Sequence, residues 1–422
     1  MKTLLSSCAG ALALSSAALA EPGTLVIAGG ALDDANAPVF EAFIEAAGGR
    51  EARFAILPTA SGYPSGSAQS FAEALAAYGV DPANITRVDL AVVNDPETER
   101  VDESRWADNA ADPGEIAKIE AAGGIWFTGG DQARIAQALI EDDGRDTPML
   151  EALRARLADG AAIGGTSAGA AMMSPVMIVR GEALTALLEE PVGLADGAEA
   201  PETDRLVLAR GLGFFPYGVT DQHFGERARL GRLARAVSVV DPALRQGYGV
   251  DENTALVIDL ARNEAAVLGE GAVTILDARQ ARSTSIAGAA RIEGMHLHLL
   301  SHEDRMSLDG LNVHVPDYKE ATVGNEYYDQ AVVSGGGMAV AGDTLQAVLG
   351  DALLDNSASD DVERVSFTGE AGVVYRFAQG RASAGFWGRD ADGEARFSAF
   401  GVDFDIVPVR LSVTALTQED AQ

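Results

Sequence analysis

The sequence predicts an α/β fold in which a mostly parallel β-sheet is covered by helices on both faces. Between residues 24 and 165, short apolar runs alternate with segments of helical periodicity, which is typical of parallel sheets. Several of these runs end in glycine, at the strand ends where such sheets bind ligands. Beyond about residue 310 the helical periodicity is absent and β-prone segments alternate with Gly and Asp, so we expect a small β-rich accessory region there.

The apolar runs and the helical patterns follow one another in a regular order. The predicted strands are 24–30, 52–60, 85–92, 123–130 and 161–165. The predicted helices are 39–47, 65–78, 115–122, 131–140 and 149–159. The β-prone segments of the last region are 372–377, 382–387 and 404–413. We therefore expect a leader peptide over 1–20, an α/β region over 21–309 and the β-rich region over 310–422.

The first 20 residues read as a secretory signal. Lys2 makes the start positive, and the apolar run that follows is shorter than a membrane span. Ala-Leu-Ala at 18–20 is a small-x-small cleavage site before Glu21. We expect cleavage after Ala20 and a secreted or periplasmic protein. A lipoprotein anchored at Cys8 is the alternative, although almost no apolar segment precedes this cysteine.

The composition excludes several classes of function. The net charge is −32, from 31 Lys and Arg against 63 Asp and Glu, so the surface should repel phosphate backbones and anionic lipids. We therefore expect neither a nucleic-acid partner nor a membrane partner. Cys8 is the single cysteine, which excludes a thiol nucleophile or a cysteine metal site in the folded body. No ligand cluster or dinucleotide fingerprint is present, so we expect no metal and no other cofactor.

The sharpest local motif is Gly-Gly-Thr-Ser-Ala-Gly at 164–169, which contains Gly-x-Ser-x-Gly between a predicted strand and a small-residue helix. A serine on so tight a turn has a strained backbone and requires small neighbours. We predict Ser167 as a nucleophile, because the helix behind it points N–H groups at developing negative charge. Ala168 would be the first oxyanion donor, and the glycines at 129 and 130 the second. A phosphate loop or a structural glycine-rich turn is the alternative.

A serine nucleophile needs a general base, and the chain has five histidines. His223 lies at the end of an apolar run and before a helix, which is again a strand-end position. The others occupy a strand face, an acidic turn and the late β region: His296, His298, His302 and His314. Elimination favours His223, whereas an α/β-hydrolase esterase would use one of the later histidines.

The third member of such a site is a carboxylate that orients the imidazole. Glu252 precedes a predicted strand and could reach the site, as its neighbour Asp251 could. Glu182 follows the nucleophile helix and is the second candidate. The sequence does not decide between Glu252 and Glu182, and either acid could instead be a solvated loop carboxylate.

Arginines follow the candidate base at helical spacing. Arg229, Arg232 and Arg235 are three residues apart, so they share a helix face that could clamp substrate carboxylates. Salt bridges to the abundant surface acids are the alternative role for this face.

Several separated motifs together resemble the cyanophycinases and aspartyl dipeptidases, which are serine peptidases of family S51. The motifs are Phe-Thr-Gly-Gly-Asp-Gln at 127–132, Gly-Thr-Ser-Ala-Gly-Ala-Ala-Met-Met-Ser at 165–174, Asp-Gln-His-Phe at 221–224 with Arg227, Arg229, Gly231, Arg232 and Leu233, Gly-Val-Asp-Glu-Asn-Thr-Ala-Leu at 249–256 and the stretch 297–304. Their order and spacing span about residues 24–310. The cyanophycinase branch fits better, because of the run from Asp221 to Leu233.

The resemblance implies a flavodoxin-like three-layer sandwich of the class I glutamine amidotransferase type. It implies Ser167 as nucleophile and His223 as base, with Glu252 preferred as the third member and Glu182 kept open. The implied oxyanion donors are Gly130 and Ala168. The residues expected to bind substrate are Gln132, Thr166, Asp221, Gln222, Arg227, Arg229 and Arg232.

The implied substrate is cyanophycin, a poly-aspartate with arginine on each side-chain carboxyl, and the implied product is β-Asp-Arg dipeptide. A peptidase acting on other aspartyl or isoaspartyl peptides is the alternative, and an inactive ligand-binding homologue is the third reading. The partner is thus a peptide or polymer substrate, with a homodimer left open. An acidic insertion around Glu182–Asp204 and the region after 310 depart from the family pattern.

Overall fold

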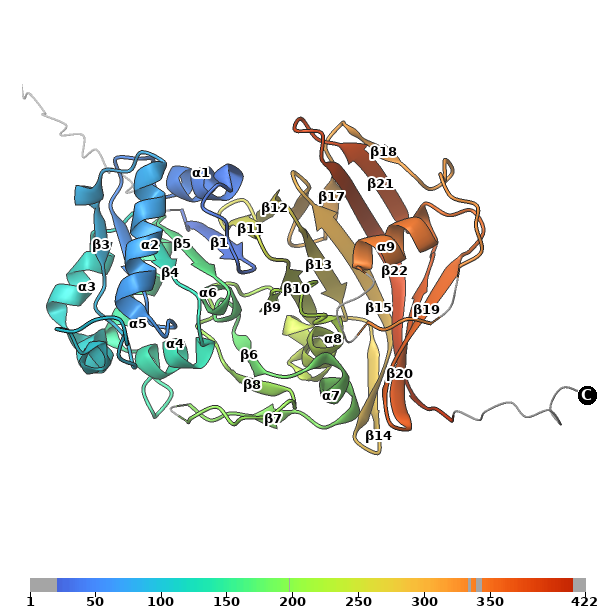
Figure 1. Cartoon of the computed structure of the whole chain (residues 1–422), viewed down its shortest axis with the longest axis horizontal. Helices are drawn as coiled ribbons and strands as arrows, with labels where there is room; N and C mark the ends of the chain where they lie inside the picture. Colours follow the sequence, from blue (N-terminus) through green and yellow to red (C-terminus); the bar gives the residue numbers. More distant parts are fainter. Residues whose placement is uncertain (1–20, 197, 333–334, 339–343, 413–422) are drawn as a thin grey trace, which may run out of the picture.

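Two large β-sheets and the helices around them make up the described chain (Figure 1). The computed structural model describes residues 21–196, 198–332, 335–338 and 344–412. The predicted leader over 1–20, with its cleavage site and Cys8, therefore lies outside the described residues. No helix within the described ranges combines the length and the apolar character that crossing a bilayer requires.

The first sheet has nine strands in the order β17-β16-β12-β11-β1-β5-β4-β2-β3. Its parallel strands are β1 (Thr24–Ala28), β2 (Phe54–Leu57), β3 (Ile85–Arg87), β4 (Gly124–Phe127) and β5 (Ala162–Thr166). The antiparallel strands that extend it beyond β1 are β11 (Thr254–Asp259), β12 (Glu264–Gly269), β16 (Arg305–Ser307) and β17 (Asn312–His314). All five strands predicted from the apolar runs are present, so the predicted α/β class is confirmed.

Strand β3 is shorter than the predicted run over 85–92. It is the last strand of its sheet, and the chain leaves the ladder just after Val88, whose N–H still bonds to Ile56 O. The next N–H, that of Asp89, donates to the Glu115 carboxylate at 2.7 Å instead of to a strand. A side chain thus takes the place of a ladder partner and ends the strand.

Helices cover both faces of the parallel strands. They are α1 (Ala37–Ala46), α2 (Pro64–Ala77), α3 (Pro113–Glu120), α4 (Gln132–Leu139) and α5 (Pro148–Ala158), and they begin within two residues of the predicted starts. Successive residues of β1 alternate between two cores: Val26 packs with α1 and α2, and Ile27 packs with α4 and α5. Asp112, Asp131 and Thr147 cap α3, α4 and α5 through their side-chain oxygens, which explains where these helices begin.

The second sheet has ten strands and extends from the middle of Figure 1, where β9 and β10 lie, to its right-hand side. They are β9 (Val219–Gln222), β10 (Gln246–Val250), β13 (Ala272–Asp277), β14 (Arg282–Ile286), β15 (Ala289–Ser301), β18 (Lys319–Ala321), β19 (Asp361–Thr368), β20 (Ala371–Ala378), β21 (Ala384–Arg389) and β22 (Ala395–Arg410). The long strands β15 and β22 pair with each other, from Ile292 with Ile406 to Leu299 with Ala399. Residues on both sides of the predicted boundary at 309 and 310 thus share one sheet.

The remaining helices and a third, small sheet lie between these strands along the chain. The helices are α6 (Ala168–Ala171), α7 (Ala183–Leu188), α8 (Leu230–Val239) and α9 (Leu345–Leu349), with 3-10 helices at Pro82–Asn84, Glu103–Ala111 and Pro242–Leu244 and a π-helical turn at Gly350–Leu354. A small sheet holds β6 (Val176–Arg180), β7 (Val192–Gly193) and β8 (Val207–Arg210). The acidic insertion lies between β6 and β8. The short α9 corrects the expectation of a last region without helices.

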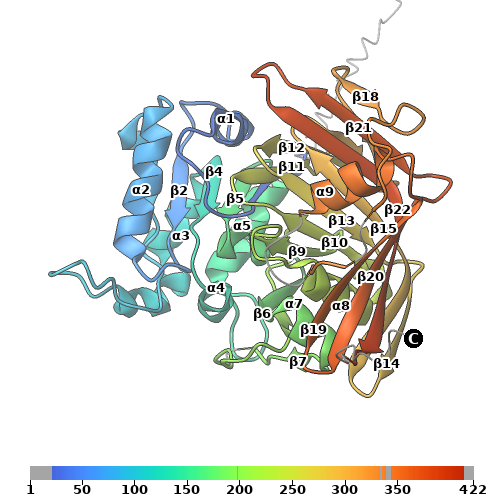
Figure 2. The ribbon, with the colours of Figure 1, turned by 45° about the vertical axis from the view of Figure 1, so that its right-hand side comes forward.

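The second sheet curves over α7 and α8, as Figure 2 shows. α7 packs against β15 and β20, and α8 packs against β14 and β15. The apolar side chains of α7 and α8, including Leu187 and Leu233, share one core with strand residues such as Leu297, Tyr375 and Phe404. The helix that follows His223 therefore shares one apolar core with strands of the β-rich C-terminal region.

A buried ion pair links β18 to the start of β16. Lys319 donates from Nζ to Asp304 Oδ1 at 2.6 Å, and both side chains are fully buried. Ser301 and Ser398 surround the pair, with Oγ atoms 2.8 and 3.1 Å from Lys319 Nζ. Removing one member of such a pair leaves an uncompensated buried charge.

Replacing Lys319 should therefore destabilise the chain strongly. We expect Lys319→Ala to lower the free energy of unfolding by about 3–5 kcal/mol, and Lys319→Met with Asp304→Leu to recover most of the loss. Lys118→Ala is the matched control, because the Lys118–Glu115 pair is partly exposed and should contribute no more than about 1 kcal/mol. Urea titrations followed by fluorescence measure all variants, and equal losses from Lys319→Ala and Lys118→Ala would contradict the argument.

Candidate active site

Three consecutive carbonyl groups at the end of β1 hold the loops that form the site. Ala28 O accepts from Ser167 N at 3.0 Å, and Gly29 O accepts from His223 N at 2.7 Å. Gly30 O accepts from Asn253 N, next to Glu252, at 2.9 Å. Strand β1 thereby brings a residue that follows β5 together with residues that follow β9 and β10, from the two different sheets.

Both glycines after β1 are required by close approach. A Cβ atom on Gly29 would lie 2.0 Å from Asp251 O, and one on Gly30 would lie 2.2 Å from the His223 ring. Gly30 also has φ 121°, in the left-handed region. The two glycines are visible in the sequence at the end of the predicted strand 24–30, where they were assigned no role in the site. This ending was the signal that other parts of the chain approach the strand end closely.

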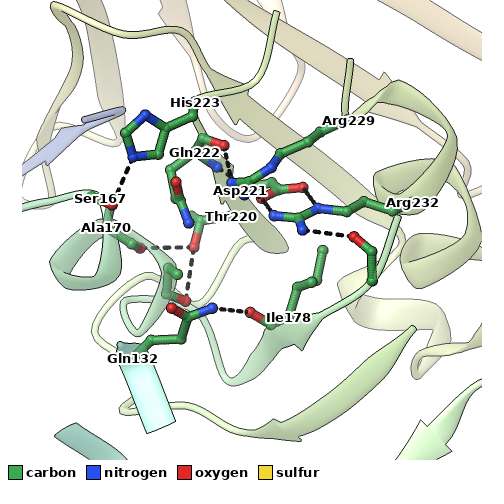
Figure 3. Close-up of polar contacts among 12 residues, drawn as sticks. Gln132, Ser167, Ala170, Ile178, Thr220, Asp221, Gln222, His223, Arg229 and Arg232 are labelled. Carbon is green, nitrogen blue, oxygen red and sulfur yellow. Dashed lines mark hydrogen bonds and ion pairs between the residues drawn. The ribbon is translucent and has the colours of Figure 1, made fainter. Parts of the chain in front are cut away.

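Ser167 lies on the predicted strand-to-helix turn, with φ 55° and ψ −109°. Its Oγ is 2.8 Å from His223 Nε2 (Figure 3). The strained backbone is tolerated because its neighbours pack without side chains: a Cβ on Gly165 would lie 2.5 Å from Gly169 O. The turn therefore presents the serine hydroxyl directly to the imidazole.

His223 connects Ser167 to a carboxylate on its other side. Its Nδ1 is 2.5 Å from Glu252 Oε1, and its own φ of 45° is in the left-handed region. Burial and the charge of Arg227 lower the pKa of His223, against the opposing effect of Glu252. The imidazole is thus neutral at neutral pH, which is the form that accepts a proton from a serine hydroxyl.

Glu182, the other candidate acid, lies elsewhere. It precedes α7, its backbone N–H bonds to Asp204 O at 2.8 Å, and its charge acts on Arg229. The contacts of the described residues join His223 to Glu252 and not to Glu182. They join none of the later histidines to Ser167.

The predicted oxyanion donors flank Ser167. Ala168 is the first residue of α6, where a helix leaves N–H groups without an intrahelical partner. On the other side, a Cβ on Gly129 would lie 3.3 Å from Ser167 Cβ. Gly130 has φ 144°, and a Cβ there would lie 2.0 Å from Ala60 O, so glycine at this position lets the loop after β4 pack against the backbone at Ala60.

Two of the residues predicted to bind substrate are paired with each other. Arg232 donates to Asp221 from Nε at 2.8 Å and from Nη2 at 2.6 Å, and its Nη1 donates to Gly181 O. Both side chains are buried, and Figure 3 shows this bidentate pair. Burial opposes ionisation of Asp221, but Arg232 and Arg229 hold its pKa below the usual range. The pair fixes the start of α8 relative to β9.

Some polar atoms of the other predicted binding residues have hydrogen-bond partners in the protein, and others have none. Gln132 donates to Ile178 O at 2.8 Å and to Val179 O at 3.0 Å. Arg229 donates to Gln222 O, and burial lowers its pKa to about 10. Among the described side chains, Gln222 Oε1 and Thr166 Oγ1 are buried without a hydrogen-bond partner in the protein. Arg227 is exposed.

Within the described ranges, no group of three or more His, Cys, Asp or Glu side chains is arranged to hold a metal ion. Ser167, His223 and Glu252 place a hydroxyl, a neutral imidazole and a carboxylate in one hydrogen-bonded line, which is the arrangement that activates a hydroxyl as a nucleophile.

Comparison with known proteins places this chain in a family. The model of peptidase family S51 matches residues 24–264. The cyanophycinase of Synechococcus elongatus is 32% identical over 293 residues, which cover 68% of this chain and 79% of the relative. The cyanophycinase of Trichormus variabilis is 31% identical over 291 residues, with 67% and 85% covered. A solved structure, that of a peptidase from an acI-B1 Actinobacterium, has a TM-score of 0.42 and 20% identity over 61% of this chain and 91% of its own. The chain therefore belongs to peptidase family S51 and is a serine peptidase, as its separated motifs predict.

Proposed function

We propose that this chain is an exported serine peptidase that hydrolyses cyanophycin to β-Asp-Arg dipeptides. Ser167 would be the nucleophile, His223 the general base and Glu252 the acid that orients the imidazole. The observation that carries the proposal is the continuous line of hydrogen bonds from Ser167 Oγ through His223 to Glu252 Oε1. No other histidine among the described residues contacts Ser167.

The mechanism follows from this line. Ser167 Oγ attacks the scissile carbonyl carbon while His223 Nε2 takes the hydroxyl proton. Glu252, as acceptor from Nδ1–H, selects the tautomer whose Nε2 is free and stabilises the imidazolium that forms. The oxyanion receives N–H groups from Ala168 and Gly130. The imidazolium then protonates the leaving amine, and a water molecule activated by His223 hydrolyses the acyl-enzyme.

Two observations support a substrate that carries both carboxylates and guanidinium groups. Gln222 Oε1 is a buried acceptor without a protein partner, and a guanidinium N–H would satisfy it. The exposed guanidinium of Arg227 affects the pKa of His223, so it lies near enough to pair with a substrate carboxylate. Cyanophycin offers both groups in every repeat, and the curated relatives named above are cyanophycinases.

Export is supported by the sequence of the leader. Lys2, the short apolar run and Ala-Leu-Ala at 18–20 form a signal peptide pattern. An exported enzyme would meet the polymer outside the cell in which it is made, as material to degrade.

Replacing the nucleophile should abolish release of dipeptide. We expect Ser167→Ala to lower the rate by about 10³-fold or more, because the hydroxyl supplies the attacking oxygen. The assay incubates insoluble cyanophycin with the mature protein and follows soluble dipeptide by mass spectrometry. Ser104→Ala, at an exposed serine, is the control and should keep full activity. Equal release by the wild type and Ser167→Ala would refute the proposal. Cleavage of isoaspartyl peptides without release of dipeptide from cyanophycin would show that such peptides, and not the polymer, are the substrate.

The two candidate acids can be separated by matched substitutions. We expect Glu252→Gln to lower kcat by about 10³- to 10⁴-fold, because the amide keeps the shape but loses the charge and the tautomer control. Glu182→Gln makes the same chemical change at the acid that does not contact His223, and kcat should stay within about 2-fold. Steady-state rates of both variants test the assignment, which is wrong if Glu182→Gln is the slower enzyme.

Processing of the leader is the third test of the proposal. When the full chain is expressed in a bacterium, the exported protein should begin at Glu21, because the small-x-small site ends at Ala20. Intact-mass spectrometry of the periplasmic or culture fraction measures this terminus. Cys8→Ser should leave processing unchanged. A lipid-modified protein that depends on Cys8 would instead establish the lipoprotein alternative.

A further inference from the structure

Asp251 links the loop of the base to the loop of the acid. Its Oδ1 accepts from Gly225 N at 2.8 Å, two residues after His223. Its Oδ2 accepts from Ala272 N at 3.0 Å, at the start of β13. Asp251 itself directly precedes Glu252. One carboxylate therefore fixes the relative positions of the two loops that carry the partners of the imidazole hydrogen bond.

The backbone around this carboxylate is shaped to approach it. A Cβ on Gly225 would lie 3.1 Å from Asp251 Oδ1, and a Cβ on Gly271 would lie 2.7 Å from Asp251 Cβ. A side chain at position 225 or 271 would thus occupy the space of the Asp251 side chain. The side chain thus fills a defined place between β10, β13 and the loop after β9.

The other side of Glu252 is anchored in a comparable way. Asn253 Oδ1 accepts from Asp33 N at 3.0 Å and from Asn36 Nδ2 at 2.8 Å. Glu252 is therefore presented by a tripeptide whose two outer side chains bind neighbouring loops. Of these two anchors, Asp251 is the one that titrates.

Burial and the charges that face Asp251 move the ionisation of its carboxyl group toward neutral pH. Burial, and then the carboxylate of Glu226, raise its pKa to about 7, against the two backbone N–H groups that it accepts. Asp251 also lines a cavity of 330 Å³, so it can exchange its proton without unfolding. The other charged residues on this cavity come from three further segments: Glu226, Arg229, Glu270 and Arg396. Glu252 faces Asp251 from the next position in the chain.

We infer that Asp251 is a positioning residue of the peptidase, whose ionised carboxylate holds the His223 loop and Glu252 in the active geometry. The inference rests on the proposed roles of Ser167, His223 and Glu252. An ionised carboxylate accepts both N–H groups equally well, whereas a protonated carboxyl has one oxygen that is a weaker acceptor. Protonation of Asp251 therefore loosens one of the two contacts, and activity falls as pH decreases through this ionisation.

Asp251→Asn tests the inference, because asparagine is uncharged at every pH and has one acceptor oxygen where the carboxylate has two. We expect the ratio of kcat between the wild type and Asp251→Asn to rise from about 2 at about pH 6 to about 10 at about pH 8.5, with KM changing by less than about 2-fold. Protonation of His223, whose pKa is lower than that of an ordinary histidine, should still reduce kcat of both proteins at low pH. Glu270→Gln removes a carboxylate from the same cavity and should leave the profile of the wild type unchanged.

Thermal stability distinguishes positioning from a purely structural role. The pKa of Asp251 is raised in the folded chain, so protonated Asp251 favours the folded state. This contribution to the free energy of unfolding is full at pH values below the pKa of an ordinary carboxyl group, and it is lost as pH rises through about 7. At about pH 8.5, Asp251→Asn should therefore unfold at the same temperature as the wild type or higher, while its kcat is lower. Loss of stability in step with activity would overturn the inference.

A substrate-independent readout separates this inference from the proposed function. The rate at which a fluorophosphonate labels Ser167, followed by intact mass, should show the same pH-dependent ratio, and Ser167→Ala should not be labelled. A constant ratio across pH, or a wild type that is never labelled, overturns the inference. Normal labelling with no release of dipeptide from cyanophycin would refute the proposed substrate and leave the role of Asp251 standing.

Discussion

The carbonyl groups of Ala28, Gly29 and Gly30 hold together the three loops that carry Ser167, His223 and Glu252. They accept the N–H groups of Ser167, His223 and Asn253, which come from two different sheets. Backbone bonds of this kind do not depend on side-chain rotamers, so the relative positions of the three loops follow from the geometry of one strand end. The two glycines are the condition for this arrangement, because a side chain at either position would occupy the space of the Asp251 backbone or the His223 ring.

The β-rich C-terminal region supports the site from behind. α8 begins directly after Arg229 and packs against β9, β10, β14 and β15 of the second sheet. Gly231 lies close to Tyr375 of β20, because a Cβ atom there would lie 2.8 Å from the tyrosine hydroxyl. On the side of β9, Arg232 of α8 is held by Asp221. α8 is thus fixed by an ion pair at one side and by apolar packing at the other. Residues beyond the segment 24–264 that the family model matches thus pack against the helix that follows His223.

Local patterns predicted much of the fold, and long-range pairing accounts for what they missed. The helices around β1 to β5 follow from periodicity within one segment, and Ser167 and His223 follow from their positions at strand ends. The pairing of β15 with β22 joins residues about a hundred positions apart, which no local period encodes. The contact of His223 with Glu252 likewise depends on the hydrogen bond from Asn253 N to Gly30 O, which joins segments far apart in the sequence. The pair of Arg232 with Asp221 depends on packing between α8 and β9.

The position of β22 at the end of the described chain has a consequence for the order of assembly. This strand pairs with β15, β20 and β21, and through β15 and β13 it belongs to the same sheet as β9 and β10. The ten-stranded sheet, whose strands β9 and β10 precede His223 and Asp251, is therefore complete only after residues 395–410 have left the ribosome. Contacts so distant in sequence form late, because the entropy of closing a long loop must be overcome first. Ser167, by contrast, follows a strand of the nine-stranded sheet, whose last strand in the chain is β17 (Asn312–His314).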